Sequence, residues 1–209
     1  MRIVETVDLC SAGDFPTSPE WRTACNEVEA AIVAIDWPHG SGSFTIRPVR
    51  KGNGVVPIKV PCVEALQRNG WQTETLPDLG TTLRGGQGRR TGDLDALRVF
   101  PGADEYRVGF EWETGNISSS HRALNKLVNT MREGAIQGGI LVLPMRALAQ
   151  FLTDRIGNFE ELQAYFDLYT SMSCVLDHGG ALRIVGVVHD EESEECLLIP
   201  KGTDGRARR

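Results

Sequence analysis

The chain has 209 residues, of which 41% are hydrophobic, enough for one domain with a sizeable buried core. Its formal net charge of −6 argues against a protein that coats nucleic acid without regard to sequence, but it is compatible with a local basic cleft. No apolar run approaches the length that crosses a bilayer and no signal peptide is seen, so we expect a single cytoplasmic domain over residues 1–209.

The first predicted helix covers residues 18–37. Ser18 offers an N-cap, and Pro19 suits the first helical position. Asp36 and the Trp37-Pro38 step are expected to end this helix. The apolar side chains that would form its buried face recur at helical spacing: Trp21, Ala24, Val28, Ile32 and Ile35.

Phe44 and Ile46 predict a short strand, and a glycine-punctuated turn then leads to a short helix around residues 63–67. Lys51 and Lys59 lie near this turn, where they can meet phosphates; solvated loop lysines explain them equally well. The five cysteines of the chain are scattered and form no C-x-x-C pair, which is typical of reduced thiols and not of a zinc site.

Residues 70–93 are polar and rich in glycine, with basic side chains at Arg84, Arg89 and Arg90. The stretch superficially resembles a phosphate-binding loop, but no Gly-Lys-Ser/Thr follows, so nucleotide binding is rejected. A loop that reaches for a nucleic-acid backbone fits the composition better.

The most informative stretch begins with a strand at residues 106–113, after a strand at residues 94–100 and a turn. Apolar side chains alternate in it with Glu111 and Glu113, so both carboxylates point to one face. Two acids side by side on a buried strand repel each other and are costly to desolvate. A divalent cation removes that cost, so the pair is typical of a metal ligand with a proton acceptor; a half-exposed, solvated strand is the plainer alternative.

The same stretch continues as a helix with an apolar stripe that includes Leu124, Leu127 and Met131. The serine run 118–120 offers its N-cap, and Gly134 follows its last turn. Backbone N–H groups at the start of a helix suit a phosphate. A metal beside a phosphate indicates phosphodiester hydrolysis.

The remaining chain predicts a fully apolar strand at 138–144, a helix at 145–152, a helix at 159–170, and strands at 182–189 and 196–200. Asn158 and Glu161 form a capping-box-like start for the helix at 159–170. Strands and helices alternate, which predicts an α/β domain with a mixed central sheet flanked by helices.

The segment GFEWETGNISSSHRALNKL resembles the BamHI family of type II restriction endonucleases. Four further segments resemble it in the same order: FTIRPVRKGNGVVPIKV (44–60), GDLDALRVF (92–100), LTDRIGNFEELQAYFDL (152–168) and LIPKGTDG (198–205). The resemblance implies the restriction-endonuclease-like PD-(D/E)XK fold. It also implies double-strand cuts at the palindrome GGATCC with 5′ overhangs, a homodimer that matches the palindrome, and a protective DNA methyltransferase in a bacterial host.

On the nuclease pattern, Asp95 is the first metal ligand, because antiparallel pairing brings it opposite Glu111. Asp93 has the same parity and is the competitor, but the resemblance favours Asp95. Glu111 would bridge the metal ions and Glu113 would lie close to the attacking water, while Trp112 points into the core and leaves its carbonyl as an additional ligand. The resemblance also implies a metal ligand at Glu74, with two Mg²⁺ ions per site and Mn²⁺ as a substitute.

Reading a duplex requires donors for guanine and acceptors for cytosine on rigid elements. The resemblance assigns base contacts to six residues: Asn116, Ser118, Arg122, Asp154, Arg155 and Asp204. Lys59, near the glycine-rich turn, is a further candidate for contact with the DNA backbone. Helix caps and a surface ion pair are the plainer explanations for several of them. The predicted dimer surface comprises the helix that follows residue 116 and the helix at 159–170, with Leu127, Met131, Tyr165 and Tyr169 as candidates, although core packing explains the same pattern.

Two alternatives keep the fold but change the activity: a repair nuclease without a palindromic substrate, and a sequence-specific DNA-binding relative that has lost catalysis. The intact set of base-reading candidates disfavours the first alternative. The presence of Asp95, Glu111 and Glu113 together disfavours the second. The resemblance departs in the basic loop 84–90 and at the C-terminal end, and neither departure touches the predicted catalytic residues.

Overall fold

The computed structural model describes residues 1–75, 92–102, 105–153, 155–173 and 179–201. Five of the predicted functional or basic residues lie outside this described part: Arg84, Arg89, Arg90, Asp154 and Asp204.

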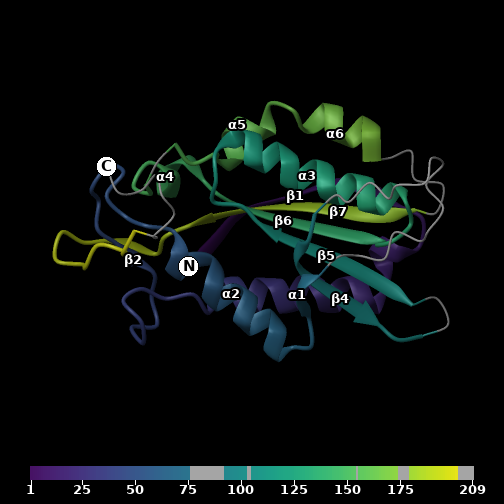
Figure 1. The fold of residues 1–209 in the computed structure, drawn as a ribbon, viewed down its shortest axis with the longest axis horizontal. Helices are drawn as coiled ribbons and strands as arrows, with labels where there is room; N and C mark the ends of the chain where they lie inside the picture. The colour runs from purple at the N-terminus through teal and green to yellow at the C-terminus, as the bar shows by residue number, and fades with distance from the viewer. Residues whose placement is uncertain (76–91, 103–104, 154, 174–178, 202–209) are drawn as a thin grey trace.

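A mixed sheet with the strand order β1-β7-β6-β5-β4-β3 runs through the centre of the molecule (Figure 1). Strands β5, β6 and β7 pair in parallel, whereas β1, β4 and β3 join in antiparallel fashion. The bounds of the six strands are β1 Arg2–Ala12, β3 Gln72–Thr75, β4 Leu94–Phe100, β5 Tyr106–Trp112, β6 Gly138–Pro144 and β7 Gly180–Val188. A small parallel pair, β2 Thr45–Ile46 and β8 Glu191–Glu192, lies apart from this sheet.

Helices cover both faces of the sheet: α1 and α2 lie on one side, and α3, α5 and α6 on the other (Figure 1). The helix bounds are α1 Pro19–Val33, α2 Val56–Arg68, α3 Ile117–Arg132, α4 Arg146–Ala149, α5 Phe159–Gln163 and α6 Phe166–Ser173, with a 3₁₀ turn at Phe15–Thr17. The predicted fold class, an α/β protein with a mixed central sheet, is confirmed. No helix in the described ranges is long and apolar enough to cross a membrane.

Local signals place several helix ends correctly. The Ser18 hydroxyl accepts a hydrogen bond from the backbone N–H of Trp21 at 3.0 Å, so it caps α1 as predicted. Asn158 caps α5 by accepting from the backbone N–H of Glu161 at 3.1 Å. The predicted serine cap of α3 is wrong, because the Asn116 side-chain oxygen accepts from the backbone N–H of Ser119 at 3.1 Å instead.

Other predicted elements differ from the structure. Helix α1 ends at residue 33, before the predicted end. Helix α2 is longer than expected, because it starts at Val56 and continues through the internal Pro61. Burial of Ile58, Cys62 and Leu66 on one face stabilises it. The helix predicted at 145–152 is a single turn, and the one at 159–170 is divided into α5 and α6. Residues 196–200 form no strand, and strands β1 and β3 were not predicted from the sequence.

The sheet divides the buried residues into two cores. Val108, Phe110 and Trp112 of β5 belong to the core against α1 and α2. The alternate positions, Gly109 and Glu111, therefore face α3. A Cβ atom on Gly109 would lie 3.0 Å from Leu94 Cδ1 and 3.2 Å from Leu127 Cδ2, so the glycine lets α3 pack closely on the strand.

Most of the residues predicted for the dimer surface are instead buried within the chain, where they pack between the sheet and its helices. Leu127, Met131 and Tyr169 are at most 4% exposed and belong to the chain's own core, which is the plainer explanation stated above. Tyr165 differs, because 48% of it is exposed.

Candidate functional site

Strand register brings the predicted acids into one row. Ala96 pairs with Thr73 on one side and with Phe110 on the other. One residue further along this register, Asp95 lies opposite Glu111 on β5 and opposite Glu74 on β3. The register therefore places Asp95 opposite Glu111, as expected, and Glu74 at the corresponding position of β3.

Asp95 is held by a cation and by the backbone of the neighbouring strand. Its Oδ1 accepts a hydrogen bond from Lys59 Nζ at 2.6 Å, an ion pair that reaches the strand from α2. Its Oδ2 accepts from the backbone N–H of Trp112 at 2.8 Å. Both oxygens are thus oriented by fixed donors, and the carboxylate is anchored between two elements of the fold.

Glu111 is a buried carboxyl that contacts a second lysine. Lys126 Nζ, from the middle of α3, donates to Glu111 Oε1 at 2.6 Å and to the backbone carbonyl of Asp93 at 2.6 Å. Burial raises the pKa of Glu111 to about 7, and the negative charge of Asp95 adds to this rise, while Lys126 and Lys59 oppose it. A carboxyl with a pKa this close to neutrality, paired with a specific charge partner, is typical of a functional site.

The raised pKa of Glu111 leads to a stability prediction for the metal-free protein. Between about pH 4.5, the ordinary value, and about pH 7, the folded state keeps a proton that the unfolded state releases. Wild-type stability should therefore fall with rising pH across this window relative to Glu111→Gln, by about 3 kcal/mol in total. Urea denaturation of both proteins at pH 4.5 and pH 8 measures this change. An equal difference at both pH values would mean that folding leaves the pKa of Glu111 unchanged.

Glu113 lies just beyond the end of β5, and it is partly exposed. Its Oε1 accepts a hydrogen bond from the backbone N–H of Gly115 at 2.6 Å, which closes the turn before α3. Glu74 is exposed, and its backbone takes a left-handed conformation with φ 49°, which is uncommon for a non-glycine residue. In the described part of the chain, no group of three acidic, histidine or cysteine side chains is placed to hold a metal ion.

The donor set nevertheless fits a hard divalent cation. Glu111 Oε1 and the Asp93 carbonyl converge on one ammonium nitrogen, and Asp95 holds another. Carboxylate and carbonyl oxygens are the ligands that Mg²⁺ and Ca²⁺ prefer. Two lysines thus neutralise the acids that we expected a metal to neutralise, which lets Asp95 and Glu111 lie close together on adjacent strands. Of the other two predicted metal ligands, Trp112 follows Glu111 directly and Glu74 is exposed.

The described base-reading candidates share one property: their side chains are exposed. Asn116 caps α3 through its side-chain oxygen, which leaves its amide N–H₂ as donor, and Ser118 lies in the first turn. Arg122 is one turn further along the helix, and Arg155 follows the short helix α4. The backbone N–H of Gly157 donates to the carbonyl of Gly115 at 2.8 Å, so the segments carrying Asn116 and Arg155 are joined. Lys59 lies at Asp95, as described above.

Asn53 is a buried residue that connects three segments of the resemblance. Its Nδ2 donates to the carbonyls of Arg47 at 2.9 Å and Phe151 at 3.1 Å, and its Oδ1 accepts from the backbone N–H of Ile199 at 3.2 Å. Its backbone N–H donates to the Phe151 carbonyl at 3.0 Å, and its own carbonyl accepts from Thr153. Asn53 therefore holds the chain directly before residue 154 and the chain shortly before residue 204.

Sequence reasoning did not single out Lys126 or Asn53. Lys126 carried one usable signal, because it stands beside Leu127 on the helix that packs against the acidic strand. Asn53, between Gly52 and Gly54, had the appearance of a turn residue. Nothing local indicates that its amide is fully buried.

A family model and two characterised relatives all identify the chain as similar to restriction endonucleases. A family model described as "Restriction endonuclease BamHI" matches residues 1–206. The chain is 44% identical over 209 residues to the type II restriction enzyme OkrAI of Oceanobacter kriegii, and the match covers all of both chains. It is 38% identical over 189 residues to the type II restriction enzyme BamHI of Bacillus amyloliquefaciens, covering 89% of this chain and 83% of that one.

Solved structures show the same fold at low sequence identity. The crystal structure of restriction endonuclease BglII with a DNA 16-mer matches with a TM-score of 0.57 and 12% identity, over 91% of this chain and 79% of that one. Free BglII matches with a TM-score of 0.50 and 13% identity, over 91% and 81% of the two chains. At these identities the likeness concerns the fold alone.

Proposed function

The chain belongs to the BamHI family of restriction endonucleases and is a type II site-specific deoxyribonuclease, and we propose that it makes Mg²⁺-dependent double-strand cuts at GGATCC, leaving 5′ overhangs. The observation that carries this proposal is the position of Asp95 beside Glu111 on the adjacent strand, one residue beyond the paired Ala96 and Phe110. These acids lie next to the turn that leads into α3, whose exposed start supplies Asn116, Ser118 and Arg122. Acids for a metal and donors for base edges thus occur on neighbouring segments.

The predicted site residues would have different roles in the reaction. Asp95, Glu111 and the Trp112 carbonyl, with Glu74, would hold the metal, and Glu113 would accept the proton of the attacking water. When bound, magnesium supplies Lewis-acid polarisation of the phosphate and a lower pKa for water. Lys126 favours the ionised form of Glu111 despite its burial, because both the hydrogen bond and the charge of the ammonium group lower the pKa of this carboxyl.

Base readout would come from exposed donors and acceptors on rigid segments. The guanidinium groups of Arg122 and Arg155 would each donate twice to guanine, and Asp154 would accept from cytosine. Asn116, Ser118 and Asp204 would complete the set, and Lys59 would contact the backbone of the same duplex. A palindromic site matches a two-fold homodimer with one active site per strand. A methyltransferase that protects the host's own GGATCC sites would accompany such an enzyme.

The direct test is digestion of unmethylated plasmid DNA with the purified protein and Mg²⁺, followed by sequencing of the ends. We expect discrete cuts at GGATCC with 5′ overhangs, and none when EDTA replaces the metal. Discrete cuts at another sequence would refute the base-reading set while keeping the nuclease. Specific binding of a GGATCC duplex without any cutting would favour a relative that has lost catalysis.

A further inference from the structure

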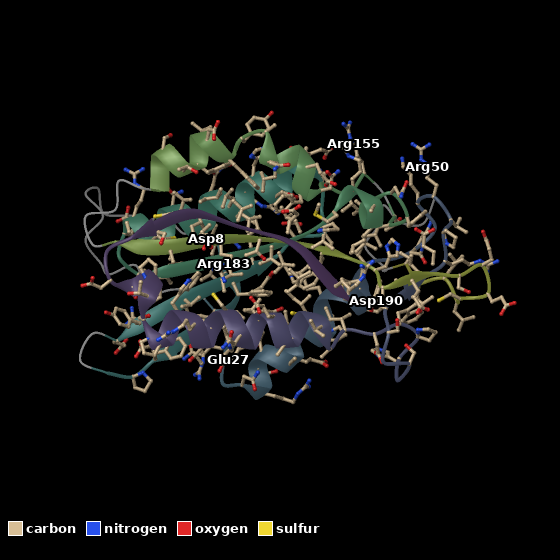
Figure 2. All side chains as sticks on the ribbon, turned by 180° about the vertical axis from the view of Figure 1, so that it is seen from behind. Asp8, Glu27, Arg50, Arg155, Arg183 and Asp190 are labelled. Atoms are coloured by element: carbon tan, nitrogen blue, oxygen red, sulfur yellow. The ribbon has the colours of Figure 1, made fainter. Side chains whose placement is uncertain are left out.

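Four basic side chains line one hollow on the surface of the molecule. Arg50 and Lys51 come from the loop before α2, Arg146 begins α4, and Arg155 follows α4. The hollow has a volume of about 220 Å³, and Glu161 is the one acidic residue among the described residues that line it. Figure 2 shows Arg50 and Arg155 extending outward at the same end of the molecule. For a chain with a net charge of −6, this is a local concentration of positive charge.

The loop that carries Arg50 and Lys51 is fixed to the segment that carries Arg155. The backbone N–H of Lys51 donates to the carbonyl of Gln150 at 3.0 Å, and Asn53 bonds to residues on the same segment, as described above. Lys51 has φ 57°, a left-handed conformation that a lysine rarely adopts. Backbone hydrogen bonds therefore fix the loop with Arg50 and Lys51 against the segment that precedes Arg155, although the two are far apart in the sequence.

All four basic side chains are exposed, and no ion pair between them and an acid occurs among the described residues. Solvated surface cations without acidic partners are the form in which proteins present charge to nucleic-acid phosphates. The bond from Gly157 to Gly115 places this hollow in continuity with the start of α3. A duplex read by Asn116 and Arg155 would bring its backbone across the hollow.

We propose that Arg50, Lys51 and Arg146 form a phosphate-binding surface for the backbone of duplex DNA, beside the base-reading Arg155. This inference rests on the proposed function. It assigns the three residues to sequence-independent affinity: they hold the duplex in register, whereas the discrimination between bases belongs to other side chains.

The test is the salt dependence of DNA binding by the full chain, measured by fluorescence anisotropy without divalent metal. The triple variant Arg50→Gln, Lys51→Gln, Arg146→Gln should reduce the magnitude of the slope of log K against log salt concentration by about 0.9 for each lost phosphate contact. The ratio of affinities for GGATCC and scrambled duplexes should stay within about threefold of the wild type. The variant Arg50→Lys, Arg146→Lys, which keeps the charges, should keep the slope.

The matched control is Arg22→Gln, Arg68→Gln, Arg132→Gln, which removes the same charge from exposed positions outside the hollow. If the control lowers the slope as much as the triple variant, or if the triple variant keeps the wild-type slope, the assignment is wrong. Loss of the affinity ratio in the triple variant would also overturn it, because the residues would then read bases. A wild type that fails to cut at GGATCC in the plasmid digestion would refute the proposed function, and the comparison of slopes would still decide the phosphate surface.

Discussion

Replacing Glu113 with Gln is expected to slow cleavage of a GGATCC duplex by a factor of about 10² to 10⁴, the range that general acid–base catalysis typically contributes. Glutamine has nearly the shape of glutamate, and its side-chain oxygen still accepts the hydrogen bond from Gly115 that closes the turn before α3. The fold and DNA binding should therefore be preserved. The chemical step alone should change, because an amide does not take a proton from water.

The measurement is single-turnover cleavage with enzyme in excess over DNA, together with anisotropy of the same duplex in EDTA. Glu113→Lys extends the test, because a lysine at this position can stabilise charge but an ammonium group accepts no proton. Cleavage at the wild-type rate by the Lys variant would refute the role of Glu113 as base. Glu133→Gln serves as control, since Glu133 is an exposed glutamate at the far end of α3.

Replacing Asn53 with Ala is expected to lower the free energy of unfolding by about 1 to 3 kcal/mol, the cost of a buried group that loses its hydrogen-bond partner. One group would lose its partner: the backbone N–H of Ile199. The Arg47 carbonyl keeps its bond from the backbone N–H of Val49. The Phe151 carbonyl keeps its bond from the backbone N–H of residue 53. Urea denaturation at equal pH measures the loss.

The same substitution should also weaken discrimination between GGATCC and other duplexes, because Asn53 holds the segments that lead to Asp154 and Asp204. Single-turnover cleavage of GGATCC should be slowed more than binding of non-specific DNA. Asn26→Ala, an exposed position on α1, is the matched control and should leave both quantities near the wild-type values. A stable Asn53→Ala protein with full specificity would show that this amide does not position the recognition segments.

Local patterns predicted much of the central part of the molecule. The alternation in residues 106–112 and the helical stripe after residue 116 both correspond to observed elements, β5 and α3. Asp95 could be placed opposite Glu111 because side-chain direction in paired strands has a period of two and the turn between these strands is short. The resemblance to a family covered the same segments, and the family is confirmed.

Local patterns failed where packing outweighs propensity. Helix α2 contains Pro57 and Pro61, which made it appear short, but burial of Ile58, Cys62 and Leu66 stabilises a full helix from Val56 to Arg68. Residues 196–200 are apolar enough for a strand. Their backbone instead bonds to Gly54 and Asn53, and a Cβ atom on Gly54 would lie 1.8 Å from the carbonyl oxygen of Pro200.

The sequence by itself determined the α/β class and the strand that carries Glu111, because each depends on spacing between near neighbours. Only the tertiary structure decided that Lys59 pairs with Asp95, that Lys126 pairs with Glu111, and that Asn53 joins three distant segments. These contacts link residues 15 to 146 positions apart. These contacts depend on which helix packs on which face of the sheet. The spacing of residue types along the chain does not indicate that packing.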